Sequence, residues 1–360
     1  MSWVVSARRT AVAPVGGAFR RLMVHELAAP VIDACLADAG LRADEVDEVI
    51  LANALGAGGN PARLAALAAG MPERVAGLSI DRQCAGGLDA IWLARALVES
   101  GTARIVVAGG AESYSRRPIR MATDPDGGPA LAYDQPAFSP FPDRDPRMHE
   151  AAANLAQRFA ISRDRMDAWA VESHAKALKS RWDMSAESVA LAGLSHDAFT
   201  RNLTMALAAR ARSIAKGITT ANAAVAADAA AFVVVSDRPI GPRPLRILAG
   251  ATLGSAPQDP GLAPILAIDQ VLRAAGLVPS DLQMAEVMEA YAAQVIACVE
   301  GVGLDPAIVN QAGGALARGH PIGASGAVLA VRLFHGLAQG YGLAAIAAAG
   351  GIGTALLVAR

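Results

Sequence analysis

The sequence contains little cysteine, few aromatic residues and no excess charge of either sign. Its three cysteines, Cys35, Cys84 and Cys298, are too few and too far apart for a disulfide framework or a metal site. Its 32 basic and 33 acidic side chains give a net charge of −1, which indicates neither nucleic-acid binding nor attraction to an anionic membrane. No run approaches the roughly 20 apolar residues of a membrane span, and the N-terminus lacks the pattern of a secretory signal. We therefore expect a cytoplasmic protein in which any functional cysteine acts as a thiol.

What the sequence does contain is an alternation of apolar strands and alanine-rich helices. Residues 49–51 and 104–108 are typical of buried strands, and Gly109-Gly110 is expected to end the second one. Residues 86–98 are apolar almost all round, which predicts a helix buried on every side. This pattern favours an α/β fold.

The two ends of the chain resemble each other. Residues 31–41 recur as residues 267–277, each as a helix that ends at a glycine suited to the left-handed C′ position. Each copy then leads through an acidic connection into an apolar strand beginning near Val49 or Val287. Either two copies of one α/β unit pack together, or two alanine-rich helices are similar by chance.

The middle of the chain, about residues 116–242, differs from both ends. A proline- and aspartate-rich stretch at 124–146 predicts an irregular loop, and two helical segments follow near 151–159 and 163–180. We interpret this region as an insertion, a common place for substrate-specificity elements.

Cys84 lies between a predicted strand and the buried helix. A cysteine at a helix N-terminus faces free backbone N–H groups, which predicts a lowered thiol pKa, and Ala85-Gly86-Gly87 would let a substrate carbonyl approach closely. The alternative is a buried structural cysteine, as we expect for Cys35 and Cys298.

His320 lies in a stretch with an unusual density of glycine, residues 313–326, directly before Pro321 and a predicted helix. Such a stiff and crowded setting suits a base or hydrogen-bond donor beside a nucleophile. The dinucleotide-binding pattern G-x-G-x-x-G with a following acidic residue is absent from this stretch. The histidines elsewhere are expected to be surface or core residues, with one exception discussed below.

The whole chain resembles the thiolase family, coenzyme A-dependent enzymes that make or cleave β-ketoacyl thioesters. The matching stretches are Asn60-Pro61-Ala62-Arg63, Cys84 with its glycines, 106–113, 219–231, 289–294 and Gly319-His320-Pro321. The resemblance implies two βαβαβαββ halves in a five-layer αβαβα sandwich. It implies a first half of residues 1–116 plus part of 225–242, a coenzyme-binding loop domain at 117–224 and a second half at 243–360. It also implies a homodimer or homotetramer that uses a coenzyme A thioester as substrate, with no tightly bound cofactor.

In that family the cysteine matching Cys84 becomes acylated, and the histidine matching His320 activates it and stabilises the oxyanion. A second cysteine in a C-x-G-G-G stretch moves the α-proton, but Ala347 stands at its position here. The family's Asn-Glu-Ala-Phe motif orders a water in the oxyanion hole through its asparagine, but this chain has Met288 there. The resemblance therefore implies that acylation is retained and that carbon–carbon chemistry is impaired.

Two further positions match the coenzyme-binding region. In the family a serine lies near the pantetheine, and this chain has Ala224 there. The family also has a Met-Gly pair beside the acyl pocket, and this chain has Met148 followed by His149. Candidate substitutes for the missing thiol are Glu289, His149 or a water, although a surface position is also open for His149.

Three hypotheses follow. The first is a thiolase-type acyltransferase in which acyl-Cys84 undergoes thiolysis, condensation (including decarboxylative condensation) or transfer to another nucleophile. The second is an acyl-thioester hydrolase. The third is a degenerate subunit that binds acyl-coenzyme A or pairs with a catalytic partner protein.

Overall fold

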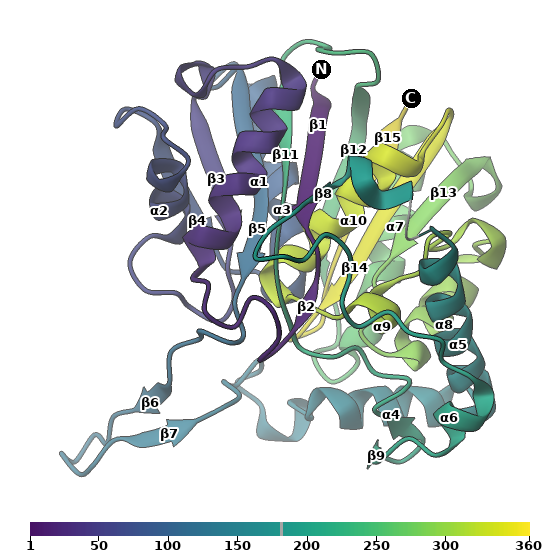
Figure 1. Cartoon of the computed structure of the whole chain (residues 1–360). Helices are drawn as coiled ribbons and strands as arrows, with labels where there is room; N and C mark the ends of the chain where they lie inside the picture. The colour runs from purple at the N-terminus through teal and green to yellow at the C-terminus, as the bar shows by residue number, and fades with distance from the viewer. Residues whose placement is uncertain (181–182) are drawn as a thin grey trace.

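The computed structural model describes residues 1–180 and 183–360, and its centre is a large mixed β-sheet (Figure 1). The strand order is β13-β14-β15-β12-β1-β11-β5-β3-β4, with β2 and β8 paired beside this path. The N-terminal strands are β1 (Trp3–Thr10), β2 (Ala13–Pro14), β3 (Glu48–Ala52), β4 (Ala76–Ile80), β5 (Ile105–Glu112) and β11 (Ala227–Ser236). The C-terminal strands are β12 (Leu245–Gly254), β13 (Leu282–Val287), β14 (Tyr341–Ala348) and β15 (Ile352–Ala359). Because β1 and β12 pair only at Trp3–Arg246 and Val4–Leu245, the sheet divides there into two halves.

Helices cover both halves and fill the space between them. The helices are α1 (Val24–Ala39) and α2 (Pro61–Ala68) outside the N-terminal half, α3 (Gly86–Glu99) and α10 (Ile322–Gly336) between the halves, and α7 (Ala263–Ala275) and α8 (Ala292–Val302) outside the C-terminal half. The central core contains Leu88 and Ile91 of α3, Val331 of α10 and strand residues from both halves. The five-layer sandwich expected from the resemblance is confirmed. The expectation that residues 86–98 are buried on every side is wrong, because Leu93 is 38% exposed and Ala96 is also exposed.

The repeated helices end as the sequence predicts. Gly40 after α1 and Gly276 after α7 both adopt the left-handed conformation, with φ of 64° and 68°. Each helix leads to a strand parallel to its neighbour, β3 in one half and β13 in the other. The second strand ends at Val287, so the expectation that it begins near this residue is wrong.

The expectation that Gly109-Gly110 ends a strand is also wrong, because β5 continues through both glycines to Glu112. A Cβ atom at Gly109 would lie 2.1 Å from the Ala231 carbonyl oxygen of β11. A Cβ atom at Gly110 would lie 2.0 Å from the Gly323 carbonyl oxygen of α10. These glycines therefore serve the close approach of neighbouring backbone, and they do not break the strand.

The segment between β5 and β11 forms the insertion. It contains the hairpin β6 (Arg120–Ala122) and β7 (Leu131–Tyr133), helices α4 (Met148–Arg158), α5 (Arg163–Ser180) and α6 (Met205–Ala209), and short strands β8 (Ser188–Val189), β9 (Ser213–Ala215) and β10 (Ile218–Thr219). The hairpin projects from the body as an arm, α4 runs along the bottom of the molecule, and α5 lies beside α8 at its right edge (Figure 1). The two helical segments predicted in this region correspond to α4 and α5.

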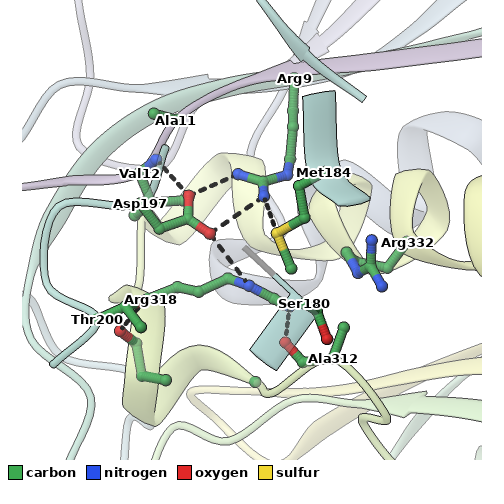
Figure 2. Close-up of polar contacts among 12 residues, drawn as sticks. Arg9, Ala11, Val12, Ser180, Met184, Asp197, Thr200, Ala312, Arg318 and Arg332 are labelled. Atoms are coloured by element: carbon green, nitrogen blue, oxygen red, sulfur yellow. Dashed lines mark hydrogen bonds and ion pairs between the residues drawn. The ribbon is translucent and has the colours of Figure 1, made fainter. Parts of the chain in front are cut away.

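A buried ion cluster joins the insertion to both halves (Figure 2). Asp197 of the insertion accepts from Arg9 of β1 at 2.7 Å and forms an ion pair with Arg318 of α9 (Ala315–Arg318) at 3.2 Å. Burial alone would raise the pKa of Asp197, but Arg9 and Arg318 together lower it. Since Arg318 lies two residues before His320, this cluster holds the histidine loop against the insertion.

Candidate active site

Cys84 lies on a tight 3-10 turn, Gln83–Ala85, between β4 and α3. Gln83 adopts a left-handed conformation with φ of 49°, which is uncommon for a residue with a side chain and typical of functional sites. Its amide N–H donates to Asp81 at 2.8 Å, which helps to hold the turn. The turn therefore presents the Cys84 side chain at the end of β4.

The glycines after Cys84 have a role in helix packing. A Cβ atom at Gly87 would lie 2.7 Å from the Ala327 nitrogen and 2.8 Å from the Gly323 oxygen, both in α10. Gly87 therefore allows helix α10 to approach closely, while the approach of a substrate carbonyl to this segment stays a prediction. This contact brings the histidine loop next to Cys84.

His320 contacts Cys84, with 3.2 Å between its Nε2 atom and the Cys84 Sγ atom. Its Nδ1 atom lies 2.6 Å from the Ser325 hydroxyl, which donates to the Pro321 carbonyl at 3.0 Å. Because that hydroxyl uses its hydrogen on Pro321, it accepts from Nδ1–H. The Nε2 lone pair therefore faces the thiol, as a base requires.

The thiol and imidazole are both neutral. Burial raises the pKa of the Cys84 thiol to about 12, although the backbone N–H groups of Cys84 and Ala349 lower it in part. Burial lowers the pKa of His320 to about 4. The expectation of a lowered thiol pKa is therefore wrong, because loss of solvation outweighs the helix N-terminus.

A cavity of about 290 Å³ opens beside this pair. Its wall is mostly apolar and includes Met148 of α4, Ala224 of the insertion and Ala347 of β14. The structure thus brings Cys84 and His320 together with these three positions. The methyl group of Ala347 offers no proton-transfer chemistry.

Glu289, Met288 and His149 do not line this cavity. Glu289 is buried with its carboxylate enclosed by donors, namely Trp169 Nε1 at 3.0 Å, Ser173 Oγ at 2.7 Å, Asn310 Nδ2 at 2.9 Å and Leu316 N at 3.2 Å. Met288 is buried in the apolar core between the sheets. The geometry therefore gives Glu289 a structural role between α5 and α9, and it places none of the three as a substitute for the missing thiol.

The other two cysteines and two of the other histidines, His174 and His335, are structural. Cys35 in α1 and Cys298 in α8 are buried, as expected, and their thiols donate to backbone carbonyls. His174 Nδ1 accepts from the Arg201 amide, and His335 lies 2.8 Å from the Ala7 carbonyl. Within residues 1–180 and 183–360, no cluster of three or more His, Cys, Asp or Glu side chains could hold a metal ion. The helices described there include none that is long and apolar enough to cross a membrane.

Sequence reasoning missed two groups of this candidate site. Ser325 sets the histidine tautomer, and the signal was its place one helical turn after Pro321 in the glycine-rich stretch. The Ala349 amide faces the thiol, but a backbone group leaves no signal in side-chain patterns. Only the folded chain brings both groups next to Cys84 and His320.

Comparison with known proteins gives a consistent result over the whole length of the chain. Residues 2–238 match the family model of the thiolase N-terminal domain, and residues 244–360 match that of the thiolase C-terminal domain. YhfS of Bacillus subtilis, which its name provisionally describes as an acetyl-CoA C-acetyltransferase, is 38% identical over 98% of both chains. An acetyl-CoA acetyltransferase of Cupriavidus necator is 36% identical over 99% of this chain and 98% of its own. The crystal structure of Acat5 thiolase from Ascaris suum with coenzyme A has a TM-score of 0.91 at 29% identity, over 100% of this chain and 99% of that one. Together with the cysteine–histidine pair at the cavity, these matches show that the chain belongs to the thiolase family.

Proposed function

We propose that the protein is a thiolase-type acyltransferase that takes an acyl group from a coenzyme A thioester onto Cys84. The observation that carries this proposal is the 3.2 Å contact between the Cys84 Sγ and His320 Nε2 atoms, with Ser325 selecting the basic tautomer. The names of two relatives support the substrate class, since both are described as acetyl-CoA acetyltransferases.

The acylation step follows from the neutral pair. His320 Nε2 removes the thiol proton as Cys84 Sγ attacks the thioester carbonyl carbon. The backbone N–H groups of Cys84 and Ala349, which already face the sulfur, then donate to the oxygen that becomes negative. Collapse breaks the carbon–sulfur bond to coenzyme A, whose thiolate takes the proton from His320.

We also propose that the insertion, residues 117–224, binds the coenzyme. Met148 and Ala224 line the cavity that leads to Cys84, and the Ascaris suum relative was crystallised with coenzyme A. In this proposal coenzyme A is part of the substrate and no other cofactor is required.

The second step is where this chain departs from the family's chemistry. We propose that condensation and thiolysis are slow, because a general acid–base group contributes about 10²–10⁴-fold and Ala347 supplies none. This same observation favours one alternative, hydrolysis of acyl-Cys84, since water needs no α-carbon deprotonation. A protein without acylation would instead be an acyl-coenzyme A-binding subunit.

Mass spectrometry tests the proposal directly. Incubation with acyl-coenzyme A of several chain lengths is expected to add the acyl mass to the peptide that contains Cys84, and a Cys84→Ala variant is expected to lose this adduct. If no chain length labels the wild-type peptide, the acyltransferase proposal is wrong. Decay of the adduct at the same rate with and without added coenzyme A would favour hydrolysis.

We further propose a cytoplasmic homo-oligomer, dimer or tetramer, with the β6–β7 arm in its interface. Ile119 and Leu131 on this arm are 83% and 71% exposed, which is unusual for large apolar side chains that stay in contact with water. Light scattering is expected to show a smaller assembly for Leu131→Glu than for the wild type. If the molar mass of the assembly is unchanged in this variant, the arm does not contribute to the interface. Cell fractionation tests the location.

A further inference from the structure

Two phenol groups lie in the cavity beside Cys84. Tyr114 follows β5, Tyr291 precedes α8, and both side chains line the wall that also contains Cys84 and His320. Among the residues that the structure describes, neither hydroxyl has a hydrogen-bond partner, whereas the Gln83 and Gln294 side chains in the same wall do. An apolar cavity with free hydroxyl groups is suited to a ligand that carries acceptors.

A β-ketoacyl thioester brings two carbonyl oxygens into this cavity, and each needs a donor. The Cys84 and Ala349 amides serve the oxygen on the carbon that the sulfur attacks. The thioester oxygen carries the charge when an enolate forms, and it needs a second donor. Met288 supplies none, because its thioether is buried in the core away from the cavity.

The backbone fixes Tyr291 relative to the catalytic pair. Tyr291 forms a β-bridge with Ala223, and the Ala290 carbonyl accepts from the Ala224 amide at 3.0 Å. The next residue, Val225, accepts from the His320 amide at 2.7 Å. One short segment thus holds both Tyr291 and His320, which preorganises the phenol beside the base.

Tyr114 is a weaker candidate than Tyr291. It lies at the junction with a second cavity of about 720 Å³ beneath the arm, and the Arg117 guanidinium lies 5.8 Å from the centre of its ring. Tyr291 lines only the cavity beside Cys84. Burial raises the pKa of Tyr291 to about 12. The phenol therefore keeps its proton at physiological pH and acts as a donor, not as a base.

We propose that the Tyr291 hydroxyl donates a hydrogen bond to the thioester oxygen of the bound β-ketoacyl-coenzyme A and stabilises its enolate. The donated proton stays on the phenol, and the α-proton that is lost goes to solvent. This assignment rests on the proposed function, since it needs a coenzyme A thioester in the cavity.

Acetoacetyl-coenzyme A on a Cys84→Ala background provides the test, because the ligand binds there without acyl transfer. Its enolate absorbs in the near ultraviolet, so a pH titration gives the apparent pKa of the bound ligand, while calorimetry measures binding separately. Adding Tyr291→Phe is expected to raise this pKa by about 1–2 pH units, as expected for loss of a hydrogen bond to a charged oxygen. Tyr341→Phe, at the opposite end of β14 from Ala347, is the matched control and should leave it unchanged.

Each outcome has a distinct meaning. If the ligand binds and Tyr291→Phe leaves its pKa unchanged, or if Tyr114→Phe raises it instead, the assignment to Tyr291 is wrong while the proposed function stands. If the Cys84→Ala protein does not bind the ligand, this assignment fails, whereas the proposed function fails only if no acyl-coenzyme A labels Cys84. A merely structural role of Tyr291 would weaken binding without changing the ligand pKa.

Discussion

The two sides of the cavity beside Cys84 differ in whether their side chains can transfer protons. The acyl side, Cys84, His320 and Ser325, is a chain of hydrogen-bonded side chains. The carbon side, formed by Ala347, Ala348 and Ala224, carries only methyl groups. Yet Ala349, directly after β14, still places its amide N–H next to the sulfur. Functions carried by side chains are lost by single substitutions, whereas those carried by backbone persist as long as the fold does.

The largest expected effect comes from removing the general base of the acyl side, His320. His320→Asn should lower the rate of Cys84 acylation by about 10²–10⁴-fold, because His320 is the only side chain hydrogen-bonded to the sulfur among residues 1–180 and 183–360. Rapid-quench mass spectrometry measures this rate. A rate within twofold of the wild type would show that His320 is not the base.

Restoring the carbon side should produce the next largest effect. Ala347→Cys should raise acetoacetyl-coenzyme A thiolysis by about 10²-fold, the lower end of what an acid–base group contributes. Ala348→Cys, one residue further along β14, is the matched control. Equal rates in the wild type and in Ala347→Cys would show that another position, Met288 first, limits the carbon chemistry.

Weakening the support of the base should have a smaller effect. Ser325→Ala removes the acceptor for Nδ1–H and frees the other tautomer, so acylation should slow by about tenfold, below the range for losing the base itself. The conservative variant Ser325→Thr keeps the hydroxyl and should restore most of the rate. Equal loss in both variants would indicate a packing role for Ser325.

The pH dependence should show the smallest effect. Since burial lowers the pKa of His320 to about 4, the imidazole stays neutral above that pH and gains a proton below it. Acylation should therefore be constant from about pH 5 to about pH 9 and fall to half near pH 4, as expected for a base with that pKa. A rate that increases through neutral pH would instead indicate a base or thiol with an ordinary pKa.

Local pattern predicted much of the fold. The glycine ends of α1 and α7 and the central position of α3 follow from periodicity and from the conformations that glycine allows. Local pattern did not predict that β5 continues through Gly109 and Gly110. These glycines are required by the close approach of β11 and α10, which lie far away in the sequence.

The candidate site shows the same division. Cys84 and His320 stand out by their neighbours in the chain, so both could be proposed from the sequence. Glu289 was a reasonable candidate by position, but its carboxylate is enclosed by donors from α5 and from the segments around Asn310 and Leu316. Position along the chain places a residue near a site, whereas the packing of distant segments decides where its side chain points.

The sequence alone therefore determined the α/β class and the similarity of the two ends of the chain, and it singled out Cys84 and His320 as the candidate nucleophile and base. The tertiary structure decided that this pair, 236 residues apart in the chain, meets at 3.2 Å, that it is neutral, and that Tyr291 and the Ala349 amide face the same cavity. The physical reason is that hydrophobic period and glycine conformation act over a few residues. Protonation depends on burial, and burial is produced by segments that only the folded chain brings together.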